Sequence, residues 1–301
     1  MNEGVIKTKK LNEKGNVAII LCVAVVALFG FTAYVVDIGL LYVQKTRISN
    51  AIDSAVMAAM LELPSNPVSA KVVALDYLEK NGMDSKEALV TISEDNKSIQ
   101  IDGVRTVNHY FAPVIGIKSG KVGVSAKAEI GPVKSATGIR PFAVEPYNFN
   151  YGEMVTLKEG AGSAYHGNFG AVSLGGRGAS TYTRNGCYGY SGTVSVGDYI
   201  DTEPGNMSGP TNSIKNFMKS DTSTFSNYTR DSIRLWTIPI VKTLDVNGRK
   251  PLLVIGFAKF FIEGDQDKSS NINGRFVQYV TSSDIDMTAI DTGLYGVKLV
   301  K

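Results

Sequence analysis

The longest apolar stretch of the chain lies near its N-terminus. Residues 17–36 carry no charged side chain, and no helical face of this run is polar. A helix rises ~1.5 Å per residue, so about twenty residues match a ~30 Å hydrocarbon core. A cleavable signal peptide has a shorter apolar region with a small-residue site behind it, and Phe31-Thr32-Ala33 fits such a site poorly. The pattern predicts a retained transmembrane helix over residues 17–41.

Basic residues flank this run unequally. Lys7, Lys9, Lys10 and Lys14 stand before it, whereas only Lys45 and Arg47 follow closely. Because basic residues are retained on the cytoplasmic side, we expect residues 1–16 to be cytoplasmic and the remainder to be exported.

A helical pattern continues past the membrane run without a proline until Pro64. Apolar residues recur at three- and four-residue spacing along one stripe of this amphipathic helix: Ile48, Ala51, Ile52, Ala55, Ala58 and Ala59. Small residues allow close approach to a neighbouring helix or sheet. Two interpretations stay open, namely packing against the chain's own globular region and assembly with other subunits.

Patterns typical of helices and of strands alternate after this helix, and we assign residues 42–138 to a helical stalk with an α+β membrane-proximal module. The expected elements are a helix capped by Ser69 and ending at Asn81-Gly82, a hairpin of 89–93 with 98–101, a helix over 106–115 and a strand over 122–130.

Composition shifts after Gly138, and glycine, serine and threonine become dense between residues 151 and 210. Short β-rich runs lie between the glycines, and longer ones follow at 233–241, 252–262 and 294–300, with one short helix expected over 211–219. We therefore expect residues 139–301 to form a Gly/Tyr-rich, mostly β exported domain.

Charge and metal-ligand content exclude several classes of function. The net charge of +3, from 31 basic and 28 acidic residues, is too slight for a nucleic-acid-binding face. Two cysteines exclude a disulfide framework, and two histidines leave little material for a transition-metal site. We expect no metal and no cofactor.

Three weaker constellations have simpler explanations. Gly175-Gly176-Arg177-Gly178 lacks the Gly-Lys-Ser/Thr of a phosphate loop, and the polar stretch from Asp265 to Gly274 meets the calcium-loop rule poorly. Cys187 and His166 have no family signature of a nucleophile–base pair. We expect no catalytic residues and no enzyme activity.

One set of motifs carries a family resemblance. Glu13-Lys14-Gly15-Asn16-Val17-Ala18, Val36-Asp37-Ile38-Gly39, Tyr42, Arg47 and Asn50–Ala55 through Ala58-Ala59 resemble the N-terminal signature of Tad (tight adherence, Flp pilus) assembly proteins of the TadE/TadG-like type. Residues 110–117 and 122–128 resemble a later segment of that family. The signature residues here are Asp37, Gly39, Tyr42, Arg47 and Asp53.

The chain departs from relatives of this type in two places. Ile20 stands where a processed prepilin has glutamate, so we expect no cleavage at Gly15. Asp221-Thr222-Ser223-Thr224-Phe225 lacks the last serine of an Asp-x-Ser-x-Ser metal site.

The resemblance implies a membrane-anchored bacterial envelope protein, single-pass, with a structural or accessory role in Tad/Flp pilus assembly or adherence. Its expected partners are the membrane and other pilus-assembly proteins or itself, without nucleic acid. The alternative is a tethered carbohydrate- or peptide-binding envelope module without a pilus role, in which the Gly/Tyr-rich surface from Tyr165 to Tyr199 holds a ligand.

Overall fold

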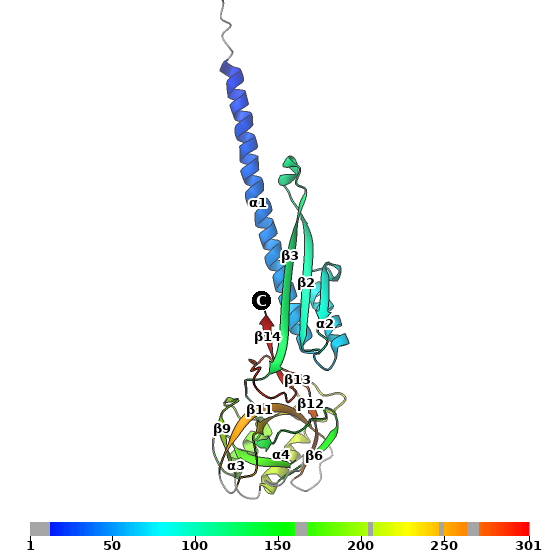
Figure 1. Ribbon diagram of the computed structural model, residues 1–301, viewed down its shortest axis with the longest axis vertical. Coiled ribbons are helices and arrows are strands. Elements are labelled where there is room, and N and C mark those ends of the chain that lie inside the picture. Colours follow the sequence, from blue (N-terminus) through cyan, green and yellow to red (C-terminus); the bar gives the residue numbers. More distant parts are fainter. Residues whose placement is uncertain (1–12, 160–167, 204–206, 247–249, 264–270, 301) are drawn as a thin grey trace, which may run out of the picture.

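A computed structural model describes residues 13–159, 168–203, 207–246, 250–263 and 271–300. Its most prominent feature is helix α1 (Glu13–Met60), which at 48 residues is ~72 Å long. The N-terminal half of α1 projects away from the rest of the molecule, and the C-terminal half packs into it (Figure 1). Among the described residues, α1 is the one helix that is long and apolar enough to cross a membrane.

The second half of α1 covers one sheet together with α2 (Pro67–Lys80). The sheet has the strand order β1-β2-β3-β14-β13. Its bounds are Ala88–Ile92 for β1, Ser98–Asn108 for β2, Ser119–Pro132 for β3, Tyr279–Val280 for β13 and Leu294–Val300 for β14. The predicted hairpin of β1 and β2 is confirmed, and the membrane-proximal module is α+β as expected.

The expected helix over 106–115 is wrong in its first half. Residues 106–108 extend β2, because they pair with residues 119–121 at the start of β3, and only the 3₁₀ turn η2 (Ala112–Ile115) is helical. The cap of α2 also differs, since the Asn66 side chain accepts a hydrogen bond from the backbone N–H of Ser69 at 3.0 Å.

The last strand of the chain returns to this sheet. Residues 295–300 of β14 pair antiparallel with residues 127–132 of β3, although the sequence pattern placed them with the C-terminal domain. An alternating pattern indicates that a strand exists but not which edge it joins. The first sheet therefore contains segments from both ends of the region that follows α1.

The remaining residues form a mostly β unit at the far end from the projecting helix (Figure 1). Pairing of β10 with both β5 and β11 closes the ring β10-β5-β7-β6-β12-β11, and β9 bridges β11 and β7. These strands are β5 (Phe142–Val144), β6 (Met154–Glu159), β7 (Asn168–Ser173), β9 (Tyr199–Thr202), β10 (Leu235–Val241), β11 (Pro251–Ile262) and β12 (Ile272–Val277).

Aromatic side chains fill the barrel-like unit. Phe142 stacks on Trp236 with ring centroids 4.9 Å apart, and Phe260 meets Phe276 edge-to-face at the same separation. The helices α3 (Ala179–Tyr188) and α4 (Ser208–Met218) contribute Tyr182 and Ile214 to this core. Helix α4 matches the short helix expected over 211–219, whereas α3 lies where only turns and short strands were expected. A short ribbon of β4 (Ser135–Ala136) with β8 (Val194–Ser195) completes the fold.

Candidate functional site

The apolar stripe of α1 faces the protein's own core. Ile48, Ala51, Ala55 and Ala59 are buried in one cluster with residues of α2, β2 and β3, and Ala58 is half-buried at its margin. Small residues permit this close packing, because a larger side chain would push the helix off the sheet. In the structure the stripe therefore contacts the α+β module of the same chain.

The close approach of helix and sheet is visible at Gly103 of β2. A Cβ atom built there would lie 2.5 Å from Met83 Cε and 2.7 Å from Ile52 Cδ1. Gly123 on the neighbouring strand faces open space, since its nearest such atom is the Gly103 carbonyl oxygen at 4.0 Å. A side chain at 103 would thus displace the buried ends of Met83 and of Ile52 on α1, whereas one at 123 would displace nothing.

The signature residues occupy different environments. Gly39, Tyr42 and Arg47 lie on the exposed face of α1, and Asp53 is half-buried. A Cβ atom at Gly39 would meet nothing within 4 Å, so no close contact inside this chain requires that glycine. The exposed signature residues are available to a lipid or a partner, whereas Asp37 is only 3% exposed.

Asp37 binds the tip of the hairpin formed by β2 and β3. Its carboxylate accepts hydrogen bonds from the backbone N–H of Tyr110 at 2.8 Å, of Phe111 at 3.1 Å and of Ala112 at 2.7 Å. These are the donors that enter η2, and such donors otherwise lack a partner at a helix start. One side chain at the end of the apolar run thus fixes a loop more than 70 residues away.

His109 precedes this tip. The predicted helical position of His109 is wrong, since it follows β2 and its backbone N–H donates to the Lys118 carbonyl oxygen at 3.0 Å. A Cβ atom built at Gly120 of β3 would lie 3.0 Å from the His109 Nε2 and 3.1 Å from Cδ2 of Leu41 on α1. The hairpin and α1 therefore also approach each other one turn after Asp37.

The N-terminal segment of the chain, which contains α1, matches a known protein family. Residues 15–62 match the family model described as "Putative Flp pilus-assembly TadE/G-like". The N-terminal segment of the chain is TadE/G-like. The matched residues comprise nearly all of α1 and end two residues beyond it, so the TadE/G-like segment contains Asp37 and the whole stripe. Neither a curated protein nor a solved structure matches the chain.

The match links the chain with Flp pilus assembly and confirms the resemblance drawn from residues 13–59. The second stretch of resemblance, over 110–117 and 122–128, lies outside the matched segment. In the structure that stretch is the hairpin tip and β3, which contact the TadE/G-like helix directly.

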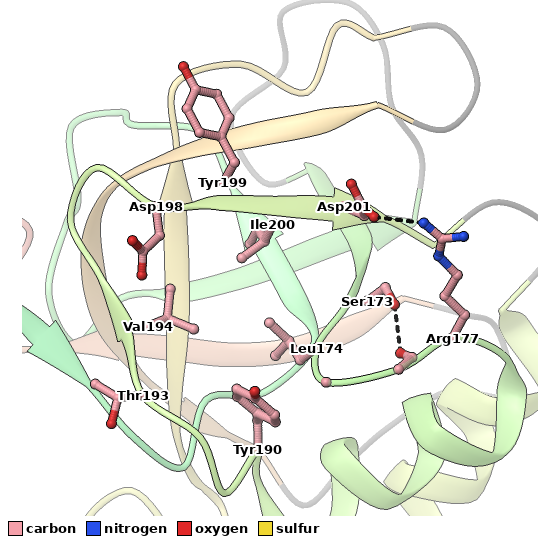
Figure 2. A pocket seen from close by; sticks show the side chains of 12 residues that line it. Ser173, Leu174, Arg177, Tyr190, Thr193, Val194, Asp198, Tyr199, Ile200 and Asp201 are labelled. Carbon is pink, nitrogen blue, oxygen red and sulfur yellow. Dashed lines mark hydrogen bonds and ion pairs between the residues drawn. The ribbon is translucent and has the colours of Figure 1, made fainter.

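The barrel-like unit carries an open cleft of about 440 Å³ (Figure 2). Arg177 and Asp201 pair across one end of it at 3.0 Å, and the ring of Tyr190 lies at another end. Gly175 has a φ of +66° and lies so close to Tyr190 that a Cβ would be 2.4 Å from its ring. The Gly175–Gly178 run is thus a tight turn over an aromatic ring, stabilised by a hydrogen bond from Ser173 Oγ to the Gly176 carbonyl oxygen.

The residues that the sequence offered for catalysis do not form a reactive pair among the described residues. Cys187 is buried on α3, and burial raises the pKa of its thiol, which disfavours a thiolate nucleophile. His166 and residues 264–270 of the polar loop lie outside the described residues.

Asp221 begins the segment that resembles a metal site. Burial acts to raise the pKa of its carboxyl group, but hydrogen bonds from Ser223 and Ser232 have the larger effect, and the net pKa is lowered to about 2. Within the described residues of the chain, no three His, Cys, Asp or Glu side chains are grouped so that they could hold a metal ion.

Proposed function

We propose that this protein is a membrane-anchored envelope protein with a structural or accessory role in the assembly of a Tad/Flp pilus or in adherence. The observation that carries the proposal is the TadE/G-like match over residues 15–62, which coincides with the projecting helix α1. Exposed apolar side chains cover the N-terminal half of this helix, which is the surface that a bilayer solvates.

The fold supports a structural role. The stripe of α1 is buried inside the chain, whereas the signature residues Tyr42 and Arg47 are exposed and available for contact with other assembly proteins. No partner needs to complete the α+β module, because α2 and the sheet already cover the stripe.

The proposed topology places residues 1–16 in the cytoplasm and the sheet and barrel-like unit outside it, because four lysines precede the run and two basic residues follow. Protease added to intact spheroplasts should destroy a C-terminal tag. A tag protected until the membrane is lysed would reverse this orientation.

Photocrosslinking in the native cells tests the pilus role. A photoreactive phenylalanine in place of Tyr42 should give adducts with Flp pilus-assembly proteins. The matched control is Tyr188 on α3, an equally exposed tyrosine of the barrel-like unit. If Tyr42 gave only lipid adducts or uncrosslinked chain in piliated cells, the exposed signature face would not bind the assembly proteins.

The cleft of the barrel-like unit favours the alternative of a carbohydrate- or peptide-binding module. Tyr190, Thr193 and the Arg177–Asp201 pair offer an aromatic face and polar groups around an open space. A cell-wall glycan or peptide that perturbs the resonances of Thr193 and Ile200, which also line the cleft, would support this function, and loss of those perturbations in Tyr190→Ala would localise the binding.

A further inference from the structure

The hairpin tip next to α1 exposes large apolar side chains. Tyr110, Val114, Ile115 and Ile117 are all exposed, and Val114 is the most exposed at 82%. Single exposed apolar residues are normal on protein surfaces, but a cluster on one loop tip indicates contact with something apolar.

This tip lies at the end of the membrane run. Asp37 is the first charged residue after residues 17–36, and its carboxylate binds the backbone N–H groups at the start of the tip. Ala33, one turn earlier and inside the run, is buried while its neighbours Tyr34 and Val35 are exposed. The contact between helix and hairpin therefore extends about one turn into the apolar run (Figure 1).

The backbone N–H groups of residues 110–112, 114, 116 and 117 in the tip are all paired within the protein. Asp37 accepts the N–H groups of residues 110–112, and residue 113 is a proline without an N–H. The N–H groups of Val114, Gly116 and Ile117 donate to carbonyl oxygens of residues 111, 113 and 112. A loop in water does not need these bonds, whereas a loop that enters lipid must satisfy its own donors.

We propose that the hairpin tip, Tyr110–Ile117, is embedded in the boundary between headgroups and acyl chains of the membrane that α1 crosses. The lipid surface is the favoured occupant because it is continuous with the exposed apolar surface of α1, beside which Asp37 holds the tip. Exposed Lys118 and Lys121 follow the tip along the chain, and side chains of this length can reach lipid phosphates. The helix and the tip together attach the exported region to the membrane at two points and restrict its rotation about α1.

This proposal depends on α1 being the membrane anchor, so the experiment reports on both. The full chain, with Cys22→Ala and Cys187→Ala, is placed in nanodiscs that hold one chain each. Single cysteines carry an environment-sensitive fluorophore at Leu28→Cys in the run, Val114→Cys at the tip, or Val68→Cys on α2. Val68 is the matched control because it is a valine 75% exposed in the same module, away from the tip.

The expected result is a blue-shifted emission at residues 28 and 114 and a water-like emission at residue 68. A lipid with a doxyl group near the headgroup should quench residue 114 more than one with a deep doxyl group, and the reverse should hold for residue 28. A second label at Ile115→Cys should behave as residue 114 does.

If residues 114 and 115 matched residue 68 while residue 28 was quenched, the tip would lie in water or await a protein partner, and the proposal would be wrong. If residue 28 was not quenched either, α1 would not be the anchor, and the proposed function would fail together with this inference.

Discussion

Replacement of Asp37 by alanine removes the acceptor for three backbone N–H groups at once. The N–H of Ala112 is buried and has no solvent to replace the carboxylate, whereas those of Tyr110 and Phe111 are partly accessible. Asp37→Ala should therefore release the hairpin tip from α1 while the sheet below it remains folded.

A hydrogen bond to a charged group contributes ~1.5–3 kcal/mol, and a partly solvated one contributes less. We assign the full value to Ala112 and roughly 1 kcal/mol to the other two donors together, which gives about 2.5–4 kcal/mol for docking of the tip. Since about 1.4 kcal/mol corresponds to tenfold, amide exchange in the tip should accelerate by about 60- to 700-fold.

Hydrogen–deuterium exchange on the full chain in nanodiscs measures this directly, in peptides that cover residues 110–117. Asp37→Asn keeps one acceptor oxygen and should give an intermediate acceleration. The control is Asp76→Ala, which removes an exposed pair with Lys80 at 2.7 Å and should leave the tip unchanged. Equal protection of the tip in Asp37→Ala and the unmodified chain would refute the role of Asp37 in docking the hairpin.

Other substitutions test the packing and the charge of the two folded units. Gly103→Ala should destabilise the α+β module by ~1–3 kcal/mol, because its Cβ meets Met83 and Ile52, whereas Gly123→Ala should be nearly neutral; exchange in β2 peptides distinguishes them. Ala55→Leu should overpack the contact between α1 and the sheet, so the unfolding temperature of the α+β module should fall while the oligomeric state in detergent stays the same. A changed oligomeric state with an unchanged unfolding temperature would contradict this packing. Burial, with Arg140 and Arg230 nearby, lowers the pKa of Lys259 to about 8. Because the unfolded lysine titrates near 10.4, the unfolded chain binds more protons between these values, so stability should rise from pH 8 to pH 10 by roughly 2 kcal/mol. Fluorescence of the single tryptophan, Trp236, reports this unfolding, and a Lys259→Met chain that retained the rise would contradict the assignment.

Features with a local cause could be predicted from the sequence. The apolar run, the amphipathic stripe and the hairpin of β1 and β2 follow from residue spacing, and the structure contains each of them. The mostly β character of the C-terminal region also followed from short alternating runs between turns.

Features that depend on distant pairing could not be predicted in the same way. Residues 106–108 became strand because β3 offered partners, and Leu294–Val300 joined the first sheet because its edge on β3 was open. Helix α3 was missed because Gly178 and Gly186 gave its sequence the composition of a turn-rich segment, although Gly186 is needed where Ile214 of α4 approaches.

The role of Asp37 was also out of reach of sequence spacing, since its partners lie 73 to 75 residues away. One signal pointed to it nevertheless. A carboxylate at the end of a membrane run is costly to bury unless donors meet it, and Asp37 has no basic residue one turn away on either side.

Deletion of the gene in the bacterium that encodes this chain tests the central claim most directly, with surface Flp pili counted by electron microscopy. We predict loss or strong reduction of pili, restored by the full chain but not by a chain whose residues 17–36 are replaced by an unrelated cleaved signal sequence. Normal pili in the deletion strain, with the neighbouring genes intact and expressed, would contradict a role in pilus assembly.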